Sequence, residues 1–314
     1  MFKPLVEIHQ IRDALAAHFD APVQDLSPID VGQMARVFSF TVNGMNYVAR
    51  FTTKRAAESI KKDRCIADRL ASSIVPVPPI IHCGISGDLY YGIARRVPGV
   101  PLRAIHGEDN WSVVTSLIET LDAIHQEDVS DTTGYGMFDS EGEGTFQQWT
   151  DFLMDVALEG GNGSFIGAWH HLFEDTFLDR TFFDLIYERM IELLPFCPEE
   201  RFLVHADYAF GNVMVKDGEV TAVLDWANAM YGDFIYDVAW MDLGSPEQDY
   251  RALFKAYYEG QERTIEHYEE RLLCYENYVS LDAQIWHAVN SNLSDYEWMR
   301  VRTLNLIERG VTSA

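Results

Sequence analysis

Residues 203–237 read L-V-H-A-D-Y-A-F-G-N-V-M-V-K-D-G-E-V-T-A-V-L-D-W-A-N-A-M-Y-G-D-F-I-Y-D. Two apolar runs flank Asp217-Gly218, and an Asp-Gly pair between such runs is a strong signal for a tight β-hairpin. That hairpin returns the chain, so we expect Asn212 and Asp225 to lie at the same end of it. Asp207 precedes Asn212 by five residues, close enough to curl back over that end.

The side chains of Asp207, Asn212 and Asp225 all carry oxygen atoms that can bind a cation or accept a proton. Mg²⁺ prefers few carboxylate ligands, with phosphate oxygens and water completing its shell. Each residue alone is typical of a cap or turn, but the three at this spacing favour Mg²⁺-phosphate chemistry. The sequence has no G-x-x-x-x-G-K-[ST] pattern, so we do not expect a P-loop enzyme.

The net charge of −25 is unevenly distributed over the 314 residues. Residues 1–100 carry a balance of +3 and residues 101–314 a balance of −28. One interpretation is that acidity only keeps the protein soluble. The other is that the first third binds an anion and the acidic remainder binds a cationic partner. In either case an acidic field repels nucleic acid, so we expect no nucleic-acid partner.

Apolar runs in this chain, such as 220–224, are far too short to span a bilayer, so we expect no membrane association. The N-terminal M-F-K-P-L-V-E-I-H-Q lacks the apolar core of a signal peptide. The four cysteines form no C-x-x-C pair and are expected to be free thiols in a reducing cytoplasm.

The pattern along the chain changes from strand-rich to helical near R-R-V-P-G-V-P at 95–101, which we interpret as an interlobe hinge. Before it we predict a helix at 5–18, a hairpin around Asn43-Gly44, a helix at 54–73 and a strand at 89–94. Beyond it we predict helices at 111–125, 149–158, 181–194, 249–258 and 265–289. The expected domains are therefore 1–97 and 98–314.

H-A-D-Y-A-F-G-N (205–212) and L-D-W (224–226) resemble the catalytic and metal-binding loops of aminoglycoside phosphotransferases, small-molecule kinases related to protein kinases. V-F-S-F-T-V-N-G-x-x-Y-V-A-R and R-R-V-P-G-V resemble the N-lobe of the hygromycin B branch of this family. T-T-G-Y-G-M-F, W-T-D-F, S-L-D-A-Q-I-W and S-D-Y-E-W resemble its C-lobe. The resemblance implies an α+β, two-lobed protein-kinase-like fold, with a small antiparallel-sheet N-lobe and a larger, mainly helical C-lobe.

The resemblance also implies roles for the residues of the central stretch. Asp207 is the catalytic residue that orients or deprotonates the acceptor hydroxyl, and Asn212 and Asp225 are Mg²⁺ ligands. His205 matches a loop histidine of structural rather than catalytic character, and Asp237 matches a buried acid that braces the loop.

The nucleotide side departs from the usual kinase pattern at two points. Arg50 occupies the strand position of the phosphate-binding Lys, with Asp63 as its expected helix partner and Glu58 as the alternative. The phosphate-covering loop at 30–36 has a single glycine, Gly32. The hinge from Arg95 to Val97 is expected to offer backbone groups to adenine.

We therefore expect ATP-dependent phosphorylation of a hydroxyl on an aminocyclitol antibiotic, with hygromycin B as the acceptor, by a cytoplasmic monomer that confers antibiotic resistance. Two alternatives stay open: a kinase for choline, homoserine, a macrolide or a sugar, and a non-catalytic nucleotide-binding relative. Candidates for the cationic acceptor's pocket are Trp149, Asp151, Asp233, Trp240, Asp282 and Glu297.

Overall fold

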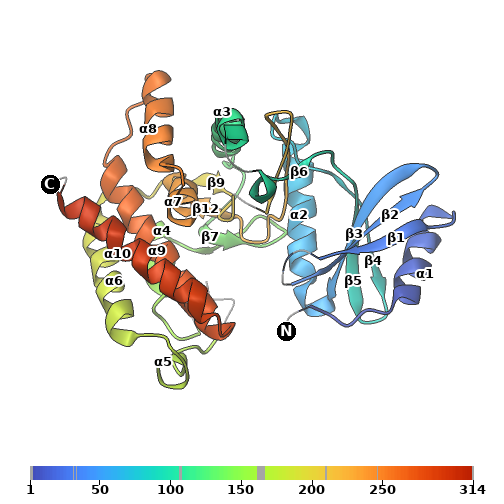
Figure 1. The fold of residues 1–314 in the computed structure, drawn as a ribbon, viewed down its shortest axis with the longest axis horizontal. Coiled ribbons are helices and arrows are strands. Elements are labelled where there is room, and N and C mark those ends of the chain that lie inside the picture. The colour runs from blue at the N-terminus through green and yellow to red at the C-terminus, as the bar shows by residue number, and fades with distance from the viewer. Residues whose placement is uncertain are drawn as a thin grey trace. The chain divides into compact units, whose positions relative to one another are not determined.

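The computed structural model describes residues 3–30, 32, 34–105, 108–160, 167–208, 211–245 and 247–312. The chain forms two compact units (Figure 1). Unit 1 consists of Met1–Ala123, Asp139–Glu141 and Ala209–Ala227, and unit 2 of Ile124–Phe138, Gly142–Tyr208 and Asn228–Ala314. This division differs from the split after residue 97 expected from the sequence.

An antiparallel five-stranded sheet forms the centre of unit 1, in the order β1-β2-β3-β5-β4. Its elements are α1 (Ile8–Phe19), β1 (Gln24–Ile29), β2 (Arg36–Val42), β3 (Met45–Thr53), α2 (Ala57–Arg69), β4 (Ile80–Ser86) and β5 (Leu89–Arg95). The predicted hairpin at Asn43-Gly44 joins β2 to β3, and both turn residues have positive φ angles, as a tight hairpin requires.

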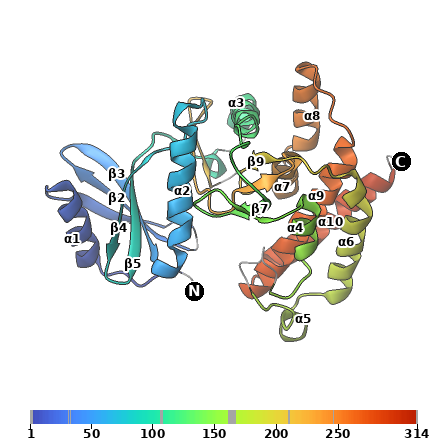
Figure 2. The same cartoon turned by 180° about the vertical axis from the view of Figure 1, so that it is seen from behind.

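The two faces of this sheet are covered by different helices, α1 on one side and α2 on the other (Figures 1 and 2). Alternate residues of β3, including Ala49 and Phe51, point into a core closed by Ile11 and Leu15 of α1. On the α2 face, a Cβ added at Gly92 would meet Ile60 at 2.7 Å, so glycine permits this close helix packing.

A second, three-stranded sheet completes unit 1 in the order β11-β10-β6. It comprises β6 (Val100–Pro101), β10 (Val213–Lys216) and β11 (Glu219–Val223). The predicted turn is confirmed, since Lys216 pairs with Glu219 and both Asp217 and Gly218 have positive φ. Because β6 pairs with β10, the proline-containing segment expected as an interlobe hinge is anchored inside unit 1. The helix α3 (Glu108–His125) follows, and its last two residues belong to unit 2.

Unit 2 is mainly helical around a four-stranded sheet of order β8-β7-β12-β9. Its strands are β7 (Tyr135–Phe138), β8 (Gly144–Phe146), β9 (Phe202–Val204) and β12 (Met230–Gly232). Its helices are α4 (Trp149–Asp155), α5 (Leu172–Asp175), α6 (Arg180–Leu193), α7 (Ile235–Gly244), α8 (Tyr250–Gly260), α9 (Tyr268–Val289) and α10 (Leu293–Thr312). Most of α9 is buried because α6, α7 and α10 all pack against it.

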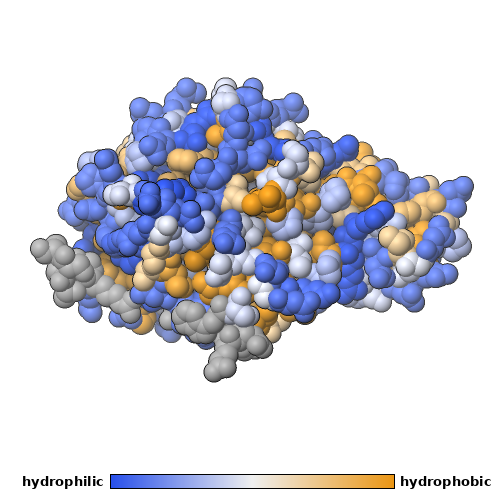
Figure 3. All heavy atoms as spheres, turned by 90° about the horizontal axis from the view of Figure 1, so that it is seen from above, coloured by the Kyte–Doolittle hydropathy of each residue, from blue (hydrophilic) through white to orange (hydrophobic). Residues whose placement is uncertain are grey.

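The space-filling view shows a face on which hydrophilic residues predominate, with hydrophobic residues gathered in smaller groups (Figure 3). No helix among the described residues is both long enough and apolar enough to span a bilayer. The α+β class expected from the sequence is confirmed by this combination of antiparallel sheets and helices.

Candidate active site

Arg50 lies in the middle of β3 and points to the α2 face, because its neighbours Ala49 and Phe51 point to the opposite core. Its guanidinium forms an ion pair with Asp63 of α2 and a second with Oδ1 of Asp225, at 3.3 Å. Burial by itself lowers the pKa of Arg50, but the carboxylates of Asp225 and Asp63 outweigh it and raise that pKa above its ordinary value. Arg50 therefore stays positively charged in unit 1.

Asp63 is almost completely buried and has two partners. One oxygen faces Arg50, and Oδ1 accepts the backbone N–H of Trp226 at 2.8 Å. Burial raises the pKa of this carboxyl despite the adjacent guanidinium. Glu58, the alternative partner of Arg50, is used elsewhere: it accepts the backbone N–H of Ser140 at 2.8 Å.

Asn212 and Asp225 lie at the same end of the β10–β11 hairpin, as the sequence predicted. Val213 pairs with Val223, and the N–H of Leu224 donates to the carbonyl of Asn212 at 2.8 Å. Asp225 has a φ of +59°, in the left-handed region that few non-glycine residues adopt.

These two side chains offer one carboxylate and one amide oxygen, both partly exposed. The described residues contain no cluster of three or more His, Cys, Asp or Glu suited to a metal ion. Hard oxygen donors that leave most of the coordination shell to phosphate and water fit Mg²⁺.

The remaining nucleotide-binding candidates also belong to unit 1. Gly32 lies between β1 and β2 with a φ of +61°, whereas its neighbours 31 and 33 lie outside the described residues. Arg95 ends β5 and is exposed, and Val97 follows in the connection to β6. The N–H of Arg96 donates to the carbonyl of Asn46 at 3.0 Å, which fixes the start of this connection.

In unit 2, Asp207 follows β9 in a loop that Asp237 holds from α7. Asp237 is fully buried and accepts the backbone N–H groups of His205 and Ala206 at 2.9 and 2.7 Å. It also contacts Nε2 of His125 at 3.0 Å. Ala206 has a φ of +60°, so these contacts hold an uncommon backbone conformation immediately before Asp207.

His205 is fully buried, and its Nδ1 accepts the backbone N–H of Asp207 at 3.2 Å. This bond assigns the imidazole proton to Nε2. The ring thus holds the backbone at Asp207, which agrees with the structural character expected for this histidine.

Asp282 of α9 stands near the phenols of Tyr236 and Tyr278. Asp282 is an exposed residue, yet desolvation by the protein packed around its carboxyl raises its pKa to about 6. Burial raises the pKa of Tyr236 well above its usual value, and Tyr278, Asp282, Asp237 and Asp207 raise it further. The structure thus brings Asp207 and Asp282 into electrostatic range of the same phenol.

The other acceptor candidates are dispersed. Trp149 and Asp233 are fully buried in a network in which Arg271 binds Asp233 through two nitrogens, at 2.6 and 2.8 Å. Tyr275 donates to Asp233 at 2.6 Å and accepts from Trp149 Nε1 at 3.1 Å. The polar atoms of this pair are therefore engaged inside unit 2. The rest lie on separate helices: Asp151 exposed on α4, Trp240 half-buried on α7 and Glu297 exposed on α10.

His125 and Lys62 were not singled out by the sequence. His125 lies on the same buried face of α3 as Leu121 and Ile124. Its position on the apolar stripe of a predicted helix could have identified it as a buried histidine. Lys62 carried no such signal, because it lies among other basic residues on α2.

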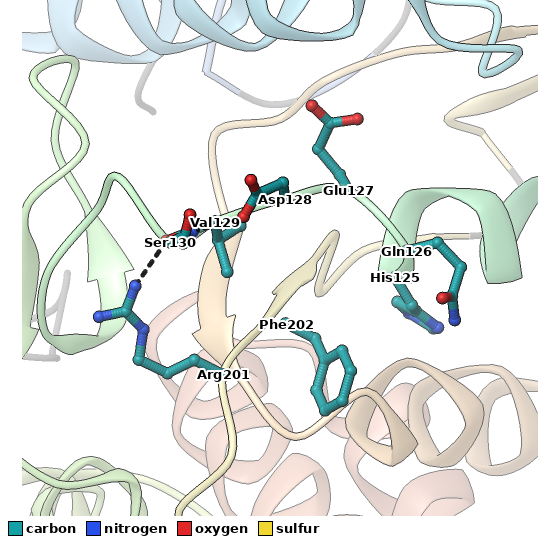
Figure 4. Close-up of a pocket in the computed structure, with 8 residues that line it drawn as sticks. All are labelled: His125, Gln126, Glu127, Asp128, Val129, Ser130, Arg201 and Phe202. Carbon is teal, nitrogen blue, oxygen red and sulfur yellow. Dashed lines mark hydrogen bonds between the residues drawn. The ribbon is translucent and has the colours of Figure 1, made fainter.

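Unit 2 also has an open hollow of about 510 Å³ (Figure 4). It is lined by His125, Gln126, Glu127, Asp128, Val129, Ser130, Arg201 and Phe202. The guanidinium of Arg201 is occupied by the carbonyls of Val129 and Thr132, both at 2.8 Å. None of the site residues predicted from the sequence lines this hollow.

Comparison with known proteins identifies relatives over nearly the whole chain. The model of the phosphotransferase enzyme family (APH) matches residues 25–272. Hygromycin-B 4-O-kinase from Escherichia coli is 32% identical over 319 residues, covering 99% of this chain and 88% of that protein.

Solved structures agree. A thermostable mutant of aminoglycoside phosphotransferase APH(4)-Ia, in ternary complex with AMP-PNP and hygromycin B, is similar with a TM-score of 0.82 and 30% identity. The match covers 96% of this chain and 99% of that one. The macrolide 2'-phosphotransferase MphH from Brachybacterium faecium, at 18% identity and a TM-score of 0.63 over 94% of this chain and 97% of that one, shares the fold.

The expected two-lobed, kinase-like fold is confirmed by these similarities. A family match that spans most of the chain, with similarity to aminoglycoside phosphotransferase structures over almost all of it, leads to one conclusion: the chain belongs to the phosphotransferase enzyme family (APH).

Proposed function

We propose that this protein transfers the γ-phosphoryl group of ATP to a hydroxyl of an aminoglycoside, and that hygromycin B is its acceptor. The observation that carries the proposal is the pairing of Arg50 with Asp63 and Asp225 at the end of the hairpin that also bears Asn212. The similarity of the whole chain to a hygromycin-B 4-O-kinase supports the choice of acceptor.

Unit 1 provides the nucleotide half of the reaction. Asn212 and Asp225 would hold Mg²⁺. When bound, this ion would neutralise negative charge on the phosphate oxygens. Arg50 adds a fixed cation for a phosphate oxygen, held in place by Asp63. We assign Gly32 to the phosphate-covering loop, and the backbone from Arg95 to Val97 to the adenine.

Unit 2 provides the acceptor half. Asp207 orients the acceptor hydroxyl and takes its proton as the phosphoryl group transfers. Asp282 is the strongest candidate for an ammonium group of the acceptor, since it lies near Tyr236 together with Asp207. The acidic balance of residues 101–314 attracts a polycationic molecule at longer range. Asp151, Trp240 and Glu297 complete the candidates at lower priority.

We further propose a monomeric enzyme of the cytoplasm, where ATP is available, that protects its host from the antibiotic. The acceptors left open by the sequence are choline, homoserine, macrolides and sugars. They differ from hygromycin B in charge or size, so a panel of acceptors separates them.

The decisive variant is Asp207→Ala. We expect it to abolish phosphorylation of hygromycin B, since the sequence of this loop, residues 205–212, has no second carboxylate to take the hydroxyl proton, while ADP affinity changes less than about twofold. Mass spectrometry follows the gain of one phosphoryl group, and calorimetry follows ADP binding. The matched control is Asp217→Ala at the exposed hairpin turn, which should keep full turnover.

Near-normal turnover in Asp207→Ala would remove Asp207 from its proposed role. If the wild-type protein phosphorylates a panel member other than an aminoglycoside, the acceptor assignment is wrong. Absence of ADP binding as well as turnover in the wild type would contradict the kinase proposal as a whole.

A further inference from the structure

Lys62 is a buried lysine whose ammonium group is used inside unit 1. Its side chain lies on α2, is only 3% exposed, and donates from Nζ to the backbone carbonyl of Ala227 at 3.2 Å. A charged amine is costly to bury unless it is hydrogen-bonded. Lys61, the preceding residue, shows the ordinary alternative: it is exposed and pairs with Glu58 on the surface of the same helix.

Lys62 and Asp63 bind successive residues of one loop. Asp63 accepts the N–H of Trp226, Lys62 donates to the carbonyl of Ala227, and Arg50 contacts the side chain of Asp225. The loop residues 225–227 are thus held by Lys62 and Asp63 of α2 and by Arg50, which pairs with Asp63.

The loop needs such support because Asp225 has a φ of +59°. For a residue with a side chain this conformation costs on the order of 1–3 kcal/mol and persists only where the surroundings impose it. The bond from Asp63 restrains the Asp225–Trp226 peptide, which follows Asp225 directly, and the bond from Lys62 restrains the chain two residues further on. The direction of the Asp225 carboxylate therefore depends on both bonds.

We propose that Lys62 is a positioning residue for the Mg²⁺-nucleotide site: by holding the Ala227 carbonyl, it keeps Asp225 in the orientation in which its carboxylate binds the metal. This inference rests on the proposed function, in which Asp225 is a Mg²⁺ ligand. Lys62 contacts neither metal nor nucleotide in this role and acts only through the loop.

Because the ammonium group of Lys62 is buried, a positioning role and a purely structural role predict different effects of its removal on stability. Burial lowers the pKa of Lys62 to about 7, although Asp63, Glu58, Cys65 and Asp139 each raise it. The folded protein thus holds this ammonium at a cost. Removing an ammonium group that burial disfavours offsets the cost of the lost hydrogen bond. Lys62→Met should therefore fold as well as the wild type while losing the bond to Ala227.

The test is ADP binding measured by calorimetry with and without Mg²⁺, on the full-length wild type, Lys62→Met and the matched control Lys61→Met. We define the magnesium gain as the ratio of the two affinities. In Lys62→Met the gain should fall about tenfold, the size of one lost hydrogen bond from a charged donor. Its affinity for metal-free ADP and its Tm should stay at the wild-type values or above. Lys61→Met should retain the full gain.

A full magnesium gain in Lys62→Met would overturn the proposal. So would an equal loss of affinity for ADP with and without the metal, accompanied by a lower Tm, since that is the result of a structural role. Should Lys62→Met not fold, Lys62→Gln is judged by the same criteria, because it removes the charge and shortens the donor. If the wild type itself binds ADP with no magnesium gain, the proposed metal site is wrong. That result differs from one in which the wild type shows the gain and only the role of Lys62 is wrong.

Discussion

Two buried carboxylates hold two backbone loops, one in each unit: Asp63 in unit 1 and Asp237 in unit 2. Both accept backbone N–H groups next to a candidate site residue, Trp226 after Asp225 and Ala206 before Asp207. In both loops a non-glycine residue has a φ near +60°. The two units thus support a strained loop by the same physical means.

The difference lies in what else each carboxylate contacts. Asp63 also binds Arg50, which in turn contacts Asp225, so this support is charged and reaches the proposed metal ligand itself. Asp237 is satisfied by two amides and His125. We infer that Asp63 sets both the position and the charge of its loop, whereas Asp237 sets position alone.

Asp237→Asn should have the largest effect on stability. An amide has one acceptor oxygen where the carboxylate has two, so one of the N–H groups of His205 and Ala206 loses its partner in a fully buried site. We expect a loss of about 3 kcal/mol in the free energy of unfolding, measured by urea denaturation. The magnesium gain in ADP affinity should be unchanged, and a reduced gain would break the comparison.

Asp63→Asn should show the reverse pattern. The remaining oxygen can still accept the Trp226 N–H, so the free energy of unfolding should fall by only about 1–2 kcal/mol. Loss of the charge frees Arg50 to bind Asp225 more tightly and to compete with the metal, so the magnesium gain should fall about tenfold. If calorimetry shows an intact gain, the carboxylate of Asp63 sets position only, as Asp237 does.

The smallest effect is expected at Asp282, where the comparison extends to the acceptor. Because desolvation by the surrounding protein raises its pKa to about 6, this exposed carboxyl becomes charged as the pH rises through 6 and then attracts an ammonium group. The KM for hygromycin B should fall severalfold between pH 5 and pH 7 in the wild type. In Asp282→Asn this pH dependence should disappear, and its persistence would assign it to another group.

Local signals explain how much of the fold was predictable. Asn43-Gly44 and Asp217-Gly218 specified both hairpins, and the helix predicted at 265–289 corresponds to α9. The strand β1 and the helix α10 were not predicted. The exposed strand β1 has no regular alternation, and the hydrophobic residues of α10 lie on both its buried and exposed sides.

Long-range contacts explain what was missed at the candidate site. The spacing of Asn212 and Asp225 around a turn placed them together, and the position of Asp63 on a helix identified the partner of Arg50. The burial of Trp149 and Asp233 depends on Arg271 and Tyr275, which are remote in sequence. The bond from Lys62 to Ala227 likewise joins segments that are distant in the sequence, so no local sequence pattern predicts it.

The pairing of β6 with β10 has a consequence for the order in which the protein forms during synthesis. The residues Val100 and Val215 pair although more than a third of the chain separates them. The sheet of β1–β5 can assemble early, but its Arg50 lacks Asp225 until the ribosome has released the hairpin. Contacts between distant segments slow folding, so we expect arrival of the β10–β11 hairpin to be the step that completes unit 1 and gives Arg50 its second carboxylate partner.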